Sequence, residues 1–339
     1  MASVSGVEGP VRETGLSLPD NPRLATGTGL EASNMAEAEE GVRLSRSYFL
    51  STLVIHLFFP LAFMPWLFSW SGLALLVLGN YLYSGLGISL CFHRTLAHRA
   101  LKLPKWLERL FAILGVCNLI ETPARFVATH RVHHRHTDRS GDPHSPQESW
   151  LQGHMLWVIF KEKHLDRPGM ARRYAKDILA DPFYAALEKG NRWLLIYLAH
   201  ATIYFLAGFT VVYSTTGNVI GGCQCGASWL LWGVFLRTLF VWHTIWAVNS
   251  VAHLRGYRNH STRDNSRNHW VVAALTNGEG WHNNHHAHPN SATFRTRWWE
   301  VDLTFLTIQG LQVLGLAREV KGPCDGHRAC SDNPELQSN

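Results

Sequence analysis

Residues 87–99 read Gly87-Ile-Ser-Leu-Cys-Phe-His93-Arg-Thr-Leu-Ala-His98-Arg99, and this stretch joins an apolar run to the first of many histidines. The apolar run, about 72–92, carries no charge and is long enough for a helix that crosses about 30 Å of hydrocarbon. Similar runs lie at about 48–69, 194–214 and 229–250. Buried helices of a soluble core rarely reach this length without charge. The sequence therefore predicts an all-α membrane protein with four transmembrane helices.

The positions of Lys and Arg predict the orientation of these helices. Of the 31 basic residues, 17 lie in 93–193 and 9 in 252–339, whereas the connections 70–71 and 215–228 contain none. Basic loops stay on the cytosolic side of a membrane. We therefore expect two helical hairpins, with both termini and a cytosolic cap (93–193 and 251–322) on one side. Cys223 and Cys225 would lie on the opposite side, most simply as free thiols.

The two ends of the chain are polar. Residues 1–42 have no apolar periodicity, so we expect a disordered tail, a membrane-integral domain at 43–322 and a C-terminal tail at 323–339. Acidic residues in the first tail argue against an organelle transit peptide. They favour a bacterial inner membrane, with endoplasmic reticulum and plastid membranes as alternatives. The net charge of +6 would suit nucleic acid, but four apolar runs make a nucleic-acid-binding protein a poor fit.

Histidine clusters are the main chemical signal among the 20 histidines of the chain. Two stretches have the pattern His-x-x-His-His, and in a helix such histidines share one face because they stand at i, i+3 and i+4. Two facing triplets would present six imidazole nitrogens to a shared volume. The stretches are His130-Arg-Val-His133-His134 and His282-Asn-Asn-His285-His286.

Further histidines flank these triplets. Asn249 and His253 stand at i, i+4 near the end of the last apolar run. His93 and His98 are five residues apart, about 140° around an ideal α-helix, and so should flank a site or contact two metals rather than stack as a pair. Nine histidines and one asparagine exceed the needs of one ion, so two metals are expected. Iron is favoured over zinc, because a structural zinc needs only four ligands. The spacing alone leaves both metals open.

Other histidines have plainer explanations. His56, His200 and His243 lie within or near the apolar runs and are expected to pack or hydrogen-bond there. His136, His144 and His288 neighbour the triplets outside their spacing, and a supporting role is the less favoured interpretation for each.

The chain resembles the membrane-bound fatty acid desaturase family, in its Δ9-type branch. The resemblance covers about 43–321 and rests on an ordered set of motifs. Besides the histidine stretches, these are Gly141-Asp-Pro-His-Ser-Pro146, Trp246-Ala-Val-Asn-Ser-Val-Ala-His253 and Gly278-Glu-Gly-Trp-His-Asn-Asn-His-His286.

This resemblance implies a di-iron centre in the cytosolic cap. The implied ligands are His93, His98, His130, His133, His134, His253, His282, His285 and His286, with Asn249 reaching the metal through water. It also implies that the enzyme takes O2 and two electrons and introduces a cis double bond into a saturated acyl chain. The haem motif of a fused cytochrome b5 domain is absent, so a separate ferredoxin or cytochrome b5 is expected as donor.

The acyl carrier stays open between acyl-lipid, acyl-CoA and acyl-carrier protein. Animal acyl-CoA members of the family carry an Arg-Asp pair just before the first triplet, and here these positions are Ala128 and Thr129. That departure weakens the acyl-CoA interpretation. Rival functions are a related di-iron membrane hydroxylase acting on a lipid, and a histidine-rich membrane metal transporter. A transporter would need its ligands at mid-membrane rather than at the span ends.

The end of the second apolar run is expected to line the substrate tunnel through Tyr81, Ser84, Gly85 and Leu86, although ordinary helix packing explains these residues equally well. On the tunnel hypothesis, a bulky side chain in this group blocks the path of the acyl chain. Gly85→Phe should therefore shorten the preferred acyl chain in product profiles measured by gas chromatography. An unchanged chain preference would reject the assignment.

Overall fold

The computed structural model describes residues 42–147, 149–162 and 167–323, all within the compact unit Val42–Asn339. Apart from Val42 and Pro323, the tails expected at 1–42 and 323–339 lie outside these residues, as do Cys324 and Cys330. The described residues are mostly helical, and two short strands among them pair antiparallel. The elements are β1 (Val42–Leu44), α2 (Arg46–Leu57), η1 (Phe59–Phe63), η2 (Pro65–Leu67), α3 (Trp70–Gly79), η3 (Asn80–Ala97), α4 (Lys105–Val116), α5 (Pro123–His136), η4 (Gln152–Leu156), α6 (Trp157–Ile159), β2 (Phe160–Glu162), α7 (Arg167–Tyr174), α8 (Lys176–Leu179), α9 (Pro182–Leu187), α10 (Arg192–Thr216), α11 (Val219–Leu230), η6 (Leu231–Leu236), α12 (Arg237–Leu254), α13 (Trp270–Leu275), α14 (His282–Ala287) and α15 (Leu303–Val313).

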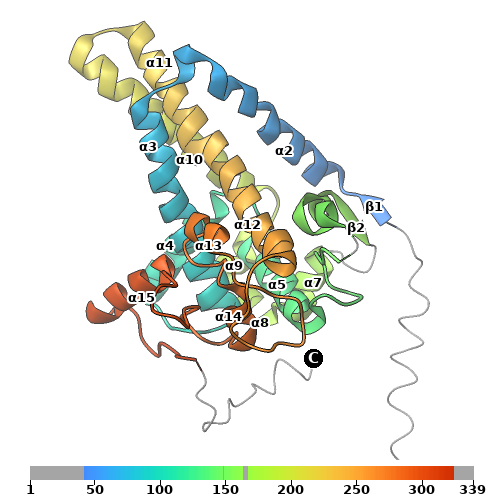
Figure 1. Ribbon diagram of the computed structural model, residues 1–339. Coiled ribbons are helices and arrows are strands. Elements are labelled where there is room, and N and C mark those ends of the chain that lie inside the picture. Colours follow the sequence, from blue (N-terminus) through green and yellow to red (C-terminus); the bar gives the residue numbers. More distant parts are fainter. Residues whose placement is uncertain (1–41, 148, 163–166, 324–339) are drawn as a thin grey trace, which may run out of the picture. The chain divides into compact units, whose positions relative to one another are not determined.

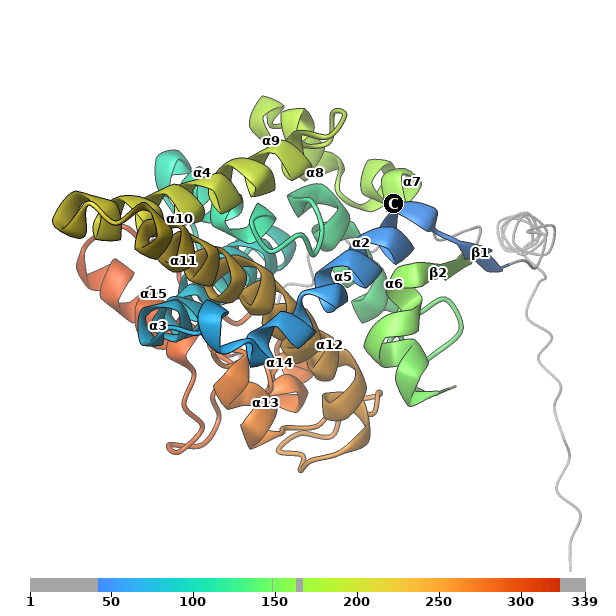
Figure 2. The same ribbon diagram turned by 90° about the horizontal axis from the view of Figure 1, so that it is seen from above.

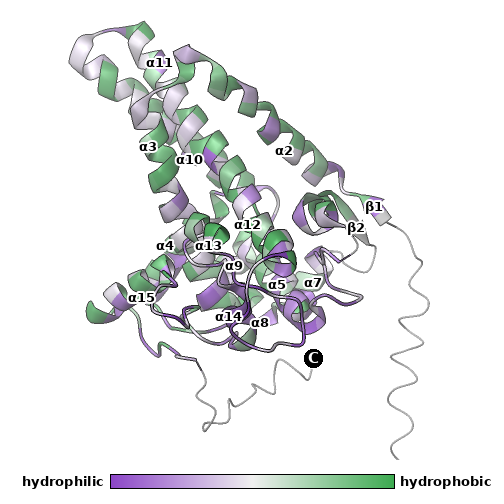
Figure 3. Ribbon diagram, viewed as in Figure 1, coloured by the Kyte–Doolittle hydropathy of each residue, from purple (hydrophilic) through white to green (hydrophobic). Residues whose placement is uncertain are grey.

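Four helical segments are long and apolar enough to cross a membrane, which confirms the predicted number among the described residues. They are Arg46–Phe63, Trp70–Ala97, Arg192–Thr216 and Val219–Leu254. Figure 1 shows them projecting from one side of a layer of shorter helices, and Figure 2 shows the same arrangement from above. Figure 3 shows that the projecting helices are mostly apolar, whereas the layer below them is rich in polar residues.

The prediction of a loop at 215–228 was wrong, because α11 occupies most of it. Helix α10 ends at Thr216, its C-cap residue Gly217 reverses the chain with a φ of 64°, and the Asn218 side chain caps α11. Glycines of α11 lie against α10: a Cβ on Gly226 would come within 2.6 Å of the Phe205 carbonyl oxygen. They allow close approach of two helices. Cys223 and Cys225 are free and lie on α11.

The first apolar segment is also less regular than predicted. Helix α2 ends at Leu57, and the rest of the expected span is two short 3-10 turns that begin around Pro60 and at Pro65. Proline lacks the backbone N–H that a continuing α-helix needs, which explains the break. Helices α4, α8 and α9 lie between the second and third apolar segments, and Asp181 separates α8 from α9.

Buried polar contacts tie the apolar helices to the layer below. Arg237, the one charged residue of its apolar run, is fully buried. Its guanidinium donates to the Asn118 side chain at 2.8 Å and to the Cys117 carbonyl at 3.0 Å. This buried charge therefore has hydrogen-bond partners on a neighbouring segment, as a buried charge requires.

The π-helical segment η3 continues α3 into the layer and packs tightly against α4. A Cβ on Gly87 would lie 2.4 Å from the Gly115 backbone nitrogen, so the two backbones touch through glycine. This contact leads into the main apolar core, which η3, α4 and α5 share.

We expect Gly87→Ala to lower the free energy of unfolding by about 1–3 kcal/mol, since the added methyl group overlaps the α4 backbone. The matched control is Gly310→Ala on α15, where a Cβ would meet nothing within 4 Å. The control should leave stability unchanged or raise it by up to about 1 kcal/mol. Thermal unfolding of purified protein in detergent measures both. Equal melting temperatures for the two variants would contradict the packing account.

Candidate metal centre

Nine histidines converge in two groups at the point where the apolar helices meet the layer below. In each group, one side-chain nitrogen from every residue lies within 4.8 Å of the others. The first group is His93, His98, His130, His134 and His285. The second group is His133, His253, His282 and His286.

Each His-x-x-His-His triplet is divided between the two groups. From α5, His130 and His134 belong to the first group, where they meet His285 of α14. From α14, His282 and His286 belong to the second group, where they meet His133 of α5. The triplets therefore do not form one shared set of six nitrogens. They form two interlocked sets, each completed by histidines from η3 and its C-terminal end or from α12.

His93 and His98 do not have the angular separation of an ideal α-helix, although their rings meet edge to edge rather than stacking. Their rings lie 4.9 Å apart in the same group. The reason is the π-helical geometry of η3, in which the His98 N–H donates to the His93 carbonyl across five residues. Residues five apart then lie close together, whereas an α-helix would rotate them away from each other.

The Nε2 atoms of these rings face one another at short range. Distances between them run from 2.6 Å (His98–His130) through 2.9 Å (His134–His285 and His253–His282) to 3.2 Å (His93–His285). His282 Nε2 faces both His253 and His286, and one proton can bridge only one of these contacts. His133 Nε2 is buried without a hydrogen-bond partner.

Carboxylates occupy the other side of four of these rings. The pairs are His93 with Glu279, His133 with Asp142, His253 with Asp138 and His286 with Asp264, each through Nδ1. A neutral imidazole that donates its Nδ1 proton to a carboxylate leaves Nε2 as a bare lone pair. Lone pairs that converge in a buried volume repel one another unless a cation lies between them. The donor set therefore fits two metal ions with nitrogen ligands.

The sequence analysis missed the role of these four carboxylates. Asp142 and Glu279 stand inside the quoted motifs and Asp138 just before one, so position relative to the histidines was an available signal. Asp264 belongs to none of those motifs. Only the fold brings it to His286, at 2.9 Å.

Burial keeps most of these imidazoles neutral. It lowers the pKa of His130, His134, His282 and His285 well below the ordinary value, and neighbouring imidazoles lower it further. Burial likewise lowers the pKa of His286, to about 4, against the opposing effect of Asp264. Burial alone would also lower the pKa of His133, but the carboxylates of Asp142, Asp138 and Asp264 together outweigh burial and raise that pKa. Neutral imidazole is the form that binds metal.

Hydrogen bonds of asparagine side chains hold the short helix α14 in place. Six residues are too few for an independent helix. The buried Asn283 side chain accepts from the backbone N–H groups of Asn259 and His260, and the Asn284 amide donates to Glu300. These contacts fix the direction in which the three α14 histidines point.

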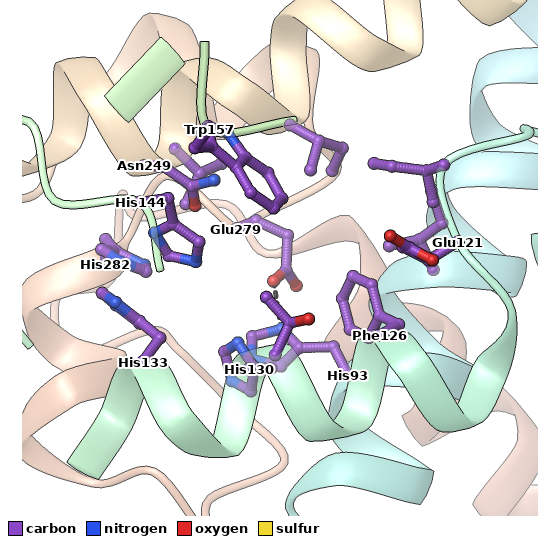
Figure 4. Close-up of a pocket in the computed structure, with 15 residues that line it drawn as sticks. His93, Glu121, Phe126, His130, His133, His144, Trp157, Asn249, Glu279 and His282 are labelled. Carbon is purple, nitrogen blue, oxygen red and sulfur yellow. Dashed lines mark hydrogen bonds and ion pairs between the residues drawn. The ribbon is translucent and has the colours of Figure 1, made fainter. Parts of the chain in front are cut away.

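A cavity opens beside both histidine groups (Figure 4). His93, His130, His133 and His282 form one part of its wall. Its apolar lining is Ile88, Ile120, Phe126, Trp157, Ile245 and Val248. Asn249 also lines it, next to His144 in Figure 4.

The four residues predicted for the tunnel lie elsewhere on the same helix. Tyr81 Oη hydrogen-bonds Thr307, Ser84 is buried, Gly85 faces Asn277, and Leu86 packs against the main core. None of them is among the residues that line this cavity, which meets η3 at Ile88 and His93. Their role in chain-length selection stays a prediction.

The histidines outside the two groups differ in their surroundings. His144 lies within 4.8 Å of His133 and Asp142 and lines the cavity. His56 and His243 hydrogen-bond each other at 3.1 Å, and His200 packs against Tyr83 and Tyr204.

We expect Asp264→Ala to weaken metal binding about 10–100-fold, because His286 loses the acceptor that orients its ring. Competition with a chelator, followed by metal analysis of the protein, measures this change. Asp177→Ala is the control, since that carboxylate pairs with Arg99 and Arg131 rather than with a ligand candidate. Metal retention equal to that of the unaltered protein would contradict the assignment.

Comparison with known proteins gives a single family. The family model for fatty acid desaturase matches residues 64–309. The sn-1 stearoyl-lipid 9-desaturase of Synechocystis sp. is 41% identical over 270 residues, covering 79% of this chain and 78% of the relative. The sn-2 palmitoyl-lipid 9-desaturase of Nostoc sp. is 39% identical, covering 76% and 84%. The acyl-CoA 5-desaturase AL21 of Anemone leveillei is 38% identical, covering 78% and 76%. The chain therefore belongs to the fatty acid desaturase family, in the Δ9-type branch, and is a fatty acyl desaturase.

Proposed function

We propose that the protein is an acyl-lipid Δ9 desaturase with a di-iron centre. The supporting observation is the cavity, because its apolar wall runs directly onto histidines of both groups. An acyl chain in it would place methylene carbons beside the metals. The net reaction joins an acyl CH2–CH2 unit, O2, two electrons and two protons to give a cis alkene and two molecules of water.

The proposed metal ligands are His93, His98, His130, His134 and His285 for one iron, and His133, His253, His282 and His286 for the other. Asn249 would complete the second site through water, consistent with its place in the cavity lining. When bound, the two irons supply the oxidising chemistry that breaking an unactivated C–H bond requires.

The protein contributes positioning and the exclusion of water. Ile88, Ile245 and Val248 present an apolar wall that would hold methylene groups in one path. The carboxylates behind four of the rings keep Nδ1 of those rings protonated and Nε2 directed inward. Asp138, Asp142 and Asp264 are not among the residues that line the cavity, whereas Glu279 is, so three of the four act from outside the substrate volume and Glu279 borders it.

A lipid-linked acyl chain is the substrate that we favour. The relatives from Synechocystis and Nostoc are named as desaturases of stearoyl-lipid and palmitoyl-lipid. Ala128 and Thr129, which stand where acyl-CoA enzymes of animals carry charges, are both buried. These positions therefore offer no charged surface to a coenzyme A headgroup.

We propose that residues 43–322 form an integral-membrane domain of two helical hairpins, with tails at 1–42 and 323–339. The distribution of Lys and Arg supports a cytosolic location for both termini and the metal centre. A separate ferredoxin or cytochrome b5 would supply the electrons. Such donors are acidic, and the basic segments of the polar layer suit them.

Expression in a host that lacks its own desaturase tests this function. Lipid extracts should gain a Δ9 unsaturated fatty acid, detected by gas chromatography and mass spectrometry. His133→Ala should abolish the new species, because the second histidine group loses the only member that α5 contributes. An alcohol in place of the alkene would instead indicate a hydroxylase. No change in the lipids, with folded and iron-loaded protein present, would refute the proposal.

A further inference from the structure

A buried ion pair lies at the end of the cavity away from the second histidine group. Glu121 lines the cavity and its carboxylate pairs with Arg167, the first residue of α7. The two side chains are only 4% and 3% exposed. In Figure 4, Glu121 and His133 lie at opposite ends of the cavity.

Aromatic side chains hold this pair in place. The Arg167 guanidinium lies over the Tyr48 ring at 4.3 Å and near the Trp157 ring at 5.0 Å. Tyr48 Oη donates to both Glu121 oxygens, at 2.9 and 3.0 Å. Two ring faces and a carboxylate thus restrain the guanidinium, which is a preorganised arrangement.

The cluster contains more hydrogen-bond donors than acceptors. Within the part of the chain that the structure describes, Arg167 Nη2 is buried without a hydrogen-bond partner, and so is Nε1 of Trp157, which lines the cavity. Leaving a buried donor unpaired costs about 1–3 kcal/mol, and more when the group is charged. An incoming acceptor oxygen would remove this cost, whereas a hydrocarbon would not.

The distance from this cluster to the histidines is similar to the distance from the carbonyl carbon of an acyl ester to its ninth carbon. From Pro123, where α5 begins two residues after Glu121, to His130 is about 10 Å along the helix axis. Eight C–C bonds of about 1.5 Å each, in a zigzag, also span about 10 Å. That is the distance from an ester carbonyl carbon to the ninth carbon of the chain. The methyl end of the chain would not be placed against a buried ion pair.

We propose that Nε1 of Trp157, which lines the cavity, and the adjacent guanidinium of Arg167, which is held by Glu121 and Tyr48 and is not itself a lining residue, together receive the carbonyl oxygen of the acyl ester. This anchor fixes how far the chain reaches toward the histidine groups, and it thereby sets the position of the double bond. The inference rests on the proposed acyl-lipid desaturase function and deepens it, since it names the group whose distance from the histidines determines the position of the double bond.

The test uses the double variant Glu121→Gln/Arg167→Met, which removes both charges and leaves no lone buried charge behind. Loss of a hydrogen bond to a charged donor should raise the share of displaced double bonds about tenfold or more. Mass spectrometry of dimethyl disulfide adducts locates the bonds. Product made only at the unaltered position, however little of it forms, would overturn the proposal.

Arg109→Gln is the matched control. This arginine lies on α4 and pairs with Asp181 at 3.2 Å, and neither residue is among those that line the cavity. It should leave the double bond in place. The same displacement in this control would also overturn the proposal, because the loss of any ion pair in the polar layer would then suffice.

A binding measurement keeps the proposal testable if the double variant does not fold. Methyl stearate should raise the melting temperature of the unaltered protein in detergent more than octadecane does, because only the ester offers a carbonyl oxygen. Arg167→Lys should reduce this difference, since lysine lacks the planar guanidinium. Equal shifts with both ligands would overturn the anchor. Failure of the desaturase function itself would appear separately, as unaltered protein that makes no unsaturated lipid.

Discussion

Nine imidazoles held in a buried volume with their Nε2 lone pairs facing one another are the constraint on which the rest of this structure depends. Such an arrangement is unfavourable by itself, since desolvation resists protonation and one proton cannot bridge three converging nitrogens. Two kinds of partner relieve it. Carboxylates on the outer side of four rings accept the Nδ1 protons. Metal ions on the inner side would take the lone pairs.

Several features of the fold follow from the need to hold these rings. The π-helical turn geometry of η3 places His93 and His98 in one group, which an α-helix could not do. The Asn283 and Asn284 side chains fix α14, which is too short to stand alone. The contact of Gly87 with Gly115 holds η3 close against α4. The four apolar segments, which are long enough to cross a membrane, lie directly next to this assembly.

Much of this organisation was predictable from the sequence because it depends on composition and spacing. Apolar runs of about 20 residues without charge predicted four long helices, and the two His-x-x-His-His patterns predicted histidines on shared helical faces. Other features depend on tertiary contacts that no local pattern encodes. The hydrogen bond between Asp264 and His286 joins residues 22 positions apart in the chain. The glycine-rich helix α11 occupies a stretch where a loop was predicted. The exchange of the i+3 histidines between the two groups also required the packing of α5 against α14.

The ion pair of Glu121 and Arg167 at the far end of the cavity is a second place where buried polar groups of the described residues lack hydrogen-bond partners. At the histidine end of the cavity, imidazole lone pairs can bind cations. At the other end, the buried N–H groups of Arg167 and Trp157 can donate to an oxygen acceptor. The apolar wall between them suits a hydrocarbon chain whose two ends are chemically different. A substrate with an ester head and a methylene chain satisfies both requirements at once.

The most direct test of the central claim is metal analysis of the purified protein, combined with X-ray absorption spectroscopy at the iron edge. The account predicts two irons per chain, each with a coordination shell dominated by imidazole nitrogen. Protein that is folded but binds no transition metal, or binds a single ion through sulfur ligands, would contradict it.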